Sequence, residues 1–168
     1  MAKKKKQILS VLVDNHSGVL ARVASLFCQR GFNIDSLTVS NTDNPEISRI
    51  TIVTEGDAAT LEQIIKQTAK LEETRNIVNL RPEDSLLREL LLVKVAADQR
   101  ARREICGICE IYRAKIVDLT VTSMIIELTG NPSKVDGFME MMKEYKIIEM
   151  CRTGITALAR GDISHEVK

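Results

Sequence analysis

The chain of 168 residues has no tryptophan, and only 3% of its residues are aromatic. Proteins that bind single-stranded nucleic acid stack the bases on aromatic side chains, so this scarcity argues against that class. The chain also has no excess of charge of one sign, because its 24 Lys and Arg residues and 23 Asp and Glu residues give a net charge of +1. Such a balance provides no broad field to recruit nucleic acid or an anionic membrane. We expect neither as a partner.

Long apolar runs are also missing. No stretch approaches the roughly 20 apolar residues of a membrane-spanning helix. The lysines at 3–6 precede only a short apolar stretch at 9–13, which does not have the form of a secretory signal. We interpret the lysine run as a solvated tail, with nucleic-acid contact as the alternative, and expect a cytoplasmic protein.

The four cysteines lie inside apolar patterns, which predicts buried, reduced thiols; they are Cys28, Cys106, Cys109 and Cys151. Cys106 and Cys109 have the spacing of a redox or metal pair, but they lie within a predicted helix and no third or fourth ligand is evident. We therefore expect this pair in the core. His16 and His165 have no partner typical of a metal site or a nucleophile, so we expect neither a catalytic nor a metal-binding residue.

The same order of elements occurs twice, with a period of roughly eighty residues that is typical of duplicated domains. Apolar periodicity predicts the strands 7–14, 34–41, 47–55 and 77–80, then 88–96, 115–121, 123–129 and 147–151. Helices are predicted after Gly18 and Asp57 in the first copy, and through Ala101–Tyr112 and after Asn131 in the second. The fold class is α+β, two ferredoxin-like β-α-β-β-α-β domains in tandem.

The polar, proline-containing stretch around Pro82 separates the two copies. The predicted division is a basic tail 1–6, a domain 7–81, a linker 82–87, a domain 88–162 and a tail 163–168. Helices on one face leave the other face of each sheet uncovered by its own chain. Because strand residues are apolar on both faces, we expect that face or an edge to meet another domain or chain.

The stretch Val11–Leu20 runs from an apolar strand through a polar loop directly into a helix. Backbone N–H groups at a helix start have no partner within the helix, so the loop at Ser17 and Gly18 offers donors to a carboxylate or phosphate. A second polar residue, Asn33, follows the far end of that helix. The alternative is that Asn15, Ser17 and Gly18 merely cap the helix and that Asn33 merely ends it.

The corresponding junction of the second copy, Ala97–Arg103, has no glycine and carries bulky charged side chains. We expect it not to bind the same ligand. Its arginines indicate a solvated face or a protein contact.

The segments Ile8–Val23 and Phe27–Val39 resemble the ACT domain of the small, regulatory subunits of acetolactate synthase, also called acetohydroxyacid synthase. The resemblance continues in Ser48–Ile52, Leu61–Ile64, Arg88–Lys94 and Arg152–Asp162, and so covers nearly the whole chain. It identifies the first domain, 7–81, as an ACT domain.

This resemblance implies a non-catalytic subunit of branched-chain amino acid biosynthesis. It would stimulate a catalytic large subunit and confer feedback inhibition by L-valine, or by leucine or isoleucine. It implies no cofactor in this chain, with thiamine diphosphate, Mg²⁺ and FAD in the catalytic partner. It also implies a homodimer formed through the ACT domains, or a tetramer.

In the family the effector lies between two paired ACT domains. Carried onto this sequence, one chain supplies the loop and helix start, and its neighbour supplies the far end of that helix. The effector-binding residues are then Asn15, Ser17, Gly18, Val19 and Leu20 from one chain and Asn33 and Ile34 from the other. The lysine head and His16 are not part of the family's pattern and receive no role.

Three other functions have requirements that can be compared with the sequence. An acylphosphatase-like hydrolase needs an arginine-lined phosphate loop at the first junction, which contains no arginine. A transcriptional regulator needs a basic helix-turn-helix, which the sequence lacks. An ACT-type sensor for another biosynthetic enzyme stays open.

Overall fold

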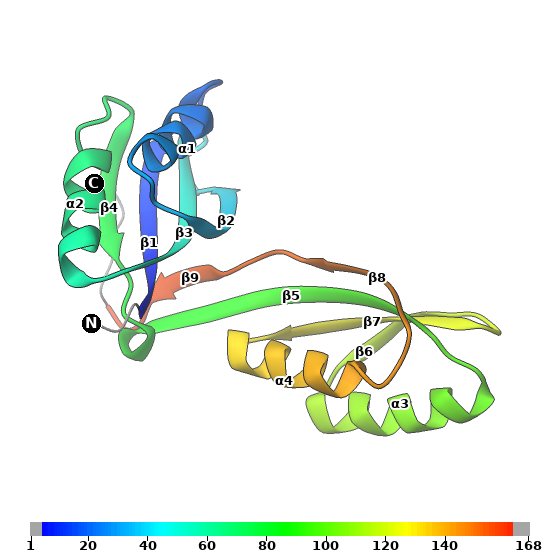
Figure 1. The fold of residues 1–168 in the computed structure, drawn as a ribbon. Coiled ribbons are helices and arrows are strands. Elements are labelled where there is room, and N and C mark those ends of the chain that lie inside the picture. The colour runs from blue at the N-terminus through cyan, green and yellow to red at the C-terminus, as the bar shows by residue number, and fades with distance from the viewer. Residues whose placement is uncertain (1–4, 163–168) are drawn as a thin grey trace. The chain divides into compact units, whose positions relative to one another are not determined.

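The computed structural model describes residues 5–162, which divide into two units (Figure 1). Unit 1 comprises the chain up to Leu86 together with the segment from Ile155 onward, and unit 2 comprises Leu87–Gly154. Most of the predicted tails, 1–6 and 163–168, lies outside the described residues. Lys5 and Lys6 are an exception, because they begin the first strand instead of belonging to a tail.

Unit 1 has the predicted β-α-β-β-α-β order. Its elements are β1 (Lys5–Asp14), α1 (Val19–Gln29), β2 (Ile34–Asn41), β3 (Ile47–Gly56), α2 (Ala58–Thr68) and β4 (Thr74–Asn79). The strands form an antiparallel sheet in the order β2-β3-β1-β4. Both helices pack on one face of this sheet, where the core residues are Leu9, Val11, Val13, Val19, Val23, Phe27, Ile50, Ile52 and Ile64.

Unit 2 repeats this arrangement. Its elements are β5 (Ser85–Ala96), α3 (Gln99–Tyr112), β6 (Lys115–Leu119), β7 (Ser123–Gly130), α4 (Pro132–Met142) and β8 (Ile147–Arg152). The sheet order β6-β7-β5-β8 is that of unit 1, shifted by one copy. Phe138 and Ile105 are fully buried between the helices and the sheet. The predicted fold, two ferredoxin-like domains in tandem, is confirmed.

Helix α1 ends in the backbone motif that a left-handed glycine permits. Gly31 has a φ of 70° and donates its N–H to the carbonyl of Cys28 at 3.1 Å. Phe32 donates to the carbonyl of Phe27 at 2.9 Å, and the two rings meet edge to face with centroids 6.2 Å apart. This is a Schellman motif with its hydrophobic contact. It fixes the direction in which the chain leaves α1 toward β2.

The connections between the domains differ from the sequence prediction. The stretch predicted as a linker, 82–87, forms a short 3-10 helix, Pro82–Asp84, and then the start of β5. The last part of the predicted domain 88–162 groups with unit 1, because residues 155–162 return to the first sheet. This segment contains β9 (Thr156–Ala159), which pairs with β5.

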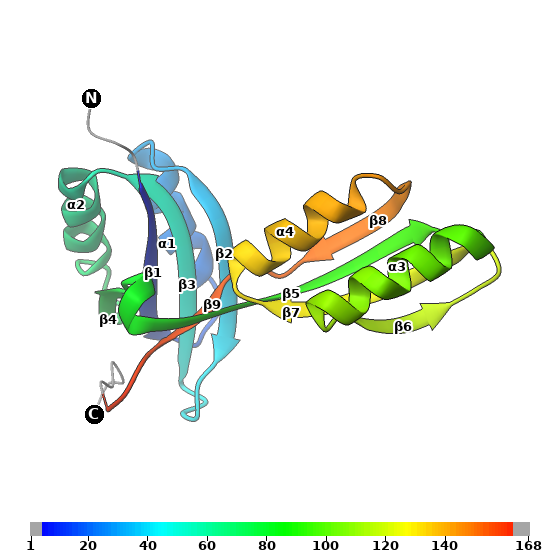
Figure 2. The same cartoon turned by 90° about the horizontal axis from the view of Figure 1, so that it is seen from below.

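Residues 155–160, here called the strap, cover the sheet face of unit 1 that lies away from its helices (Figure 2). Thr38 donates its hydroxyl to the Ile155 carbonyl at 2.5 Å, and Arg160 donates its N–H to the Asp84 carbonyl at 2.8 Å. The prediction of an uncovered face is therefore wrong for unit 1. On that face the apolar side chains of Ile8, Leu12 and Val53 are at most 4% exposed.

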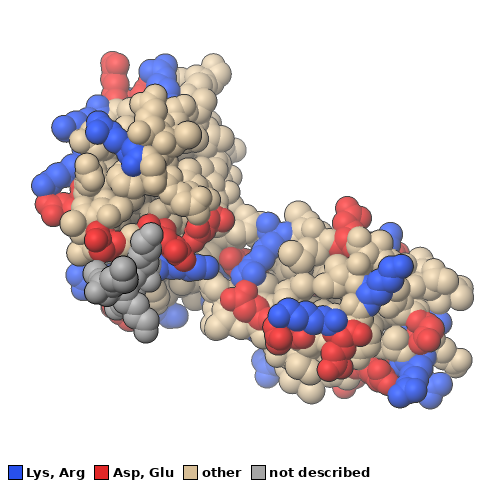
Figure 3. Space-filling model, in the orientation of Figure 1, with Lys and Arg blue, Asp and Glu red and all other residues tan. Residues whose placement is uncertain are grey.

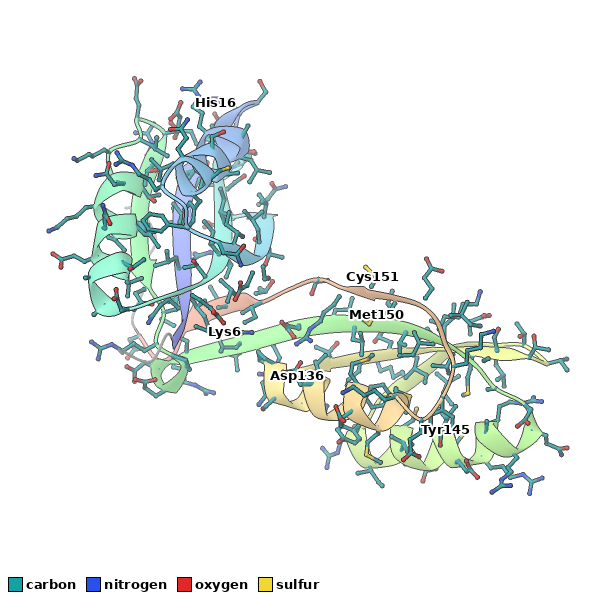
Figure 4. All side chains as sticks on the ribbon, in the orientation of Figure 1. Lys6, His16, Asp136, Tyr145, Met150 and Cys151 are labelled. Carbon is teal, nitrogen blue, oxygen red and sulfur yellow. The ribbon has the colours of Figure 1, made fainter. Side chains whose placement is uncertain are left out.

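The cysteines do not share one environment. Cys109 is buried in the core of unit 2, and burial raises the pKa of its thiol to about 11. Cys106 packs partly against the same core, as predicted. Cys28 and Cys151 are exposed, so the prediction of burial is wrong for them. Cys151 lies opposite Leu92 on the sheet face away from α3 and α4 (Figure 4).

Candidate functional site

The loop between β1 and α1 is held against the turn between β2 and β3. Asn15 donates its backbone N–H to the Glu46 carbonyl and its side-chain amide to the Pro45 carbonyl, both at 2.8 Å. With its amide nitrogen fixed in this way, its Oδ1 is the atom left to accept a hydrogen bond. The exposed His16 follows in the same loop (Figure 4).

Helix α1 begins without a side-chain cap. Its N-cap residue is Gly18, with a φ of 91°, and a Cβ placed there would meet nothing within 4 Å. The Val19 N–H lies 3.5 Å from the His16 carbonyl, which is long for a hydrogen bond. The alternative interpretation, in which Asn15, Ser17 and Gly18 cap this helix, is therefore right for the position of Gly18 and wrong for side-chain capping by Asn15 or Ser17. The first turn presents backbone donors and the positive end of the helix dipole to open space.

The other three α-helices among residues 5–162 are capped. Helix α2 is capped by Asp57, whose side chain accepts from the Thr60 N–H. Helix α3 is capped by Asp98, which accepts from the Arg100 and Ala101 N–H groups. Helix α4 is capped by Asn131, which accepts from the Lys134 N–H. The junction of unit 2 that corresponds to the β1–α1 loop thus has its donors occupied by a carboxylate of its own chain. This agrees with the expectation that only the first junction suits an anion.

The far end of α1 leads to Asn33 and a β-bulge. Asn33 donates its side-chain amide to the Asp35 carboxylate at 2.6 Å, and its carbonyl accepts from the fully buried Thr54 hydroxyl at 2.6 Å. The ladder with β3 shifts register between Ile34 and Ser36, so Asp35 is the extra residue. Asn33 is exposed and held on both sides, again with its Oδ1 left to accept.

The structure separates the predicted site residues into two groups. Asn15, Ser17 and Gly18 precede α1, whereas Asn33 follows it, and an 11-residue helix spans about 16 Å. One chain therefore does not bring the two asparagines to one small ligand.

The apolar members of the predicted site differ in exposure. The side chain of Val19 is in the core and only 3% exposed, so only its backbone faces the loop. Leu20 is 43% exposed, and Ile34 is half-buried.

Two acidic side chains near the loop, Asp14 and Glu73, are paired with arginines. Arg75 donates two hydrogen bonds, of 2.6 and 2.7 Å, to the Asp14 carboxylate. These bonds hold the pKa of Asp14 below its ordinary value. Arg22, on α1, forms an ion pair with the mostly buried Glu73. Acidic and basic side chains also alternate over the face shown in Figure 3. The two ion pairs therefore compensate the negative charge of Asp14 and Glu73 near the loop.

Two residues that position the site were not predicted from the sequence. Pro45 belongs to a recognisable turn, but nothing in the sequence pairs that turn with Asn15, which lies 30 residues earlier. Asp35 orients Asn33 only because the bulge places them together.

Within residues 5–162, no group of three or more His, Cys, Asp or Glu side chains is arranged to hold a metal ion, and no helix is long and apolar enough to span a membrane.

Comparisons with known proteins cover both units. Residues 9–76 match a family described as the acetohydroxyacid synthase small subunit-like ACT domain, and residues 88–161 match one described as the small subunit of acetolactate synthase. A probable acetolactate synthase small subunit from Archaeoglobus fulgidus is 49% identical over 94% of this chain and 98% of its own length. The acetolactate synthase isozyme 3 small subunit of Escherichia coli is 44% identical, over 94% and 97%.

A solved structure agrees with these sequences. The crystal structure of the acetolactate synthase small subunit from Thermotoga maritima superposes with a TM-score of 0.88 at 40% identity, covering 95% of this chain and 99% of that one. Sequence and fold match over both units and at nearly full length. The chain therefore belongs to the acetolactate synthase small-subunit family.

Proposed function

We propose that this chain is the regulatory subunit of an acetolactate synthase of branched-chain amino acid biosynthesis. It has no catalytic role, binds and stimulates a catalytic large subunit, and makes that subunit sensitive to feedback inhibition by L-valine, or by leucine or isoleucine. Thiamine diphosphate, Mg²⁺ and FAD belong to the catalytic partner. The family relationship over nearly the whole chain supports the partner, and the uncapped start of α1 supports the effector.

The effector site needs a second copy of the chain. Strand β2 is at an edge of its sheet, with Asn33 before its first residue and the turn containing Pro45 after its last. Antiparallel pairing of two β2 edges brings the start of one strand beside the end of the other. Asn33 of one copy then approaches the Pro45 turn of its partner, to which the partner's Asn15 is bonded. The bond between Asn15 and the Pro45 turn, at the end of β2 opposite Asn33, is the observation that supports the proposed site.

The two halves complement a zwitterionic, branched amino acid. The free N–H groups at Gly18 and in the first turn of α1 donate hydrogen bonds to the ligand carboxylate, whose negative charge the helix dipole favours. The oriented Oδ1 atoms of Asn15 and Asn33 accept from the ligand ammonium group. Leu20 and Ile34 remain accessible enough to contact the aliphatic side chain.

Calorimetric titration of the full chain with valine, leucine and isoleucine tests ligand binding. Reconstitution with an acetolactate synthase catalytic subunit tests stimulation and inhibition. We expect heat with at least one of the three amino acids and a rate increase on reconstitution. If none of the three amino acids produces heat, the proposed effector site is wrong. If the catalytic subunit is not stimulated, the chain regulates another enzyme.

Mixing two defective variants tests whether the site lies between copies. Gly18→Asp damages the loop half and Asn33→Ala damages the other half. In a mixed dimer one site carries both changes, whereas the second site combines the intact loop of one chain with the intact Asn33 of the other. Mixed and re-equilibrated variants should therefore recover about a quarter of the sites, a purely statistical result of C2 symmetry. Recovery of none would place the site within a single chain.

A further inference from the structure

We propose that Ser36 and Thr38 are positioning residues that connect the effector site to the strap, so that they set the strength of the inhibitory response. This inference rests on the proposed function. Both residues lie on β2, on the face away from the helices, because they pair with Val53 and Thr51 while the intervening Leu37 pairs with the core residue Ile52.

The two hydroxyls hold one residue of the strap from both sides. Thr38 donates to the Ile155 carbonyl at 2.5 Å, and the Ile155 N–H donates to the Ser36 hydroxyl at 3.4 Å. The Ile155 side chain is 7% exposed, so these polar contacts are backed by apolar packing. Ile155 is therefore the point at which the strap is fixed to β2.

Ser36 also adjoins the bulge that orients Asn33. The bulged residue Asp35 lies between Ser36 and Ile34 and accepts the hydrogen bond from the Asn33 side chain. A continuous series of contacts thus joins Ile155, Ser36, Asp35 and Asn33. A ligand that binds Asn33 acts on the bulge, and Ser36 and Thr38 transmit a shift of the bulge to the strap.

The strap is a short tether from unit 2. The last residue of β8, Arg152, forms an ion pair with the mostly buried Glu89 and bonds to Asp136 at 2.7 Å. Only Thr153 and Gly154 separate Arg152 from Ile155. A shift of β2 that moves Ile155 therefore reaches the end of β8 along the chain through only two residues. Coupling between two sites requires such a shared element with differential contacts in the two states.

The test compares Thr38→Val with Thr156→Val in the reconstituted complex. Both remove a hydroxyl, but Thr156 is exposed on the strap and its hydroxyl has no hydrogen bond among the described residues. One net hydrogen bond is worth a factor of about 3 to 10 in an equilibrium constant. We expect Thr38→Val to raise the half-inhibitory valine concentration by that factor, with valine binding to the isolated chain and stimulation unchanged. Thr156→Val should behave as the wild type, and Thr38→Ser should restore the response.

Three outcomes would overturn the inference. Equal inhibition of Thr38→Val and Thr156→Val would show that the contact does not affect the response. Loss of valine binding by isolated Thr38→Val, together with a lower melting temperature, would reduce Thr38 to a structural role. If the wild-type chain itself binds no valine, the effector site and this inference fail together, whereas the first two outcomes leave the effector site intact.

Discussion

The substitution Gly18→Asp places a carboxylate where the proposed effector carboxylate binds. Gly18 starts α1 with a φ of 91°, and a Cβ at this position meets no atom within 4 Å. The new side chain therefore has room. It adds a negative charge beside the N–H groups of the first turn, which are the proposed donors to the ligand.

Two effects contribute to the expected loss. Any residue with a Cβ at this φ costs about 1–2 kcal/mol of backbone strain, which lowers stability but is the same for Ala, Asn and Asp to first order. Two carboxylates about 4 Å apart repel by about 1 kcal/mol in water and about 4 kcal/mol at the effective dielectric of a protein surface. We therefore expect Gly18→Asp to bind valine about 5-fold to 1,000-fold more weakly than Gly18→Asn. The separation is below the Debye length of about 8 Å, so the difference persists at physiological salt.

Calorimetry on the isolated variants and valine titration of the reconstituted complex measure this difference. Gly18→Ala reports the strain alone, and Gly18→Asn adds a neutral side chain that can cap the helix. Stimulation of the catalytic subunit should survive in all three variants. If Gly18→Asp and Gly18→Asn bind valine equally well, the ligand carboxylate does not lie at the start of α1 and the reasoning is refuted.

Three further predictions concern stability and reactivity. Arg75→Met should raise the Asp14 pKa toward its ordinary value of 3.8, as followed by NMR titration. Because the folded-state pKa is depressed, the stabilisation is present at neutral pH and is lost as the pH falls through that pKa, so the variant should unfold more easily in urea near neutral pH and equally at about pH 2. Ile155→Ala removes a side chain that is 7% exposed and should cost about 2–4 kcal/mol in urea unfolding; a cost near zero would contradict the packing of the strap. In mass spectrometry after iodoacetamide treatment near neutral pH, the exposed Cys28 and Cys151 should be modified first, and Cys109, whose pKa is about 11, only after unfolding.

The local sequence patterns predicted most of the fold. The buried residues of α1, Val19, Val23 and Phe27, follow a three-to-four spacing, and Gly31 follows its end with a φ of 70°, so both features are local to the helix. Capping residues such as Asp57 and Asn131 marked the helix starts for the same reason. These signals are local, since helix periodicity and capping depend on residues within a few positions of one another.

The predictions from the sequence were wrong where the surroundings of a residue depend on residues that are distant in the chain. Exposure of Cys28 and Cys151 depends on which strand or helix face turns toward the core at their position, and an apolar neighbourhood in the sequence does not define that face. The strap is the larger case. Its residues were predicted to belong to the second domain, 88–162, but its hydrogen bonds are made to Thr38 and Ser36, more than a hundred residues earlier.

The sequence by itself determined the duplicated β-α-β-β-α-β order, the family, and the residues around Gly18 and Asn33 as candidates for a ligand site. Only the tertiary structure decided that Asn15 binds the Pro45 turn instead of capping α1, that α1 starts uncapped, and that α1 separates the two halves of the site. It also decided that the strap covers the first sheet. The physical reason is the same in each case, because hydrogen bonds and apolar burial between distant segments depend on where the folded chain places them.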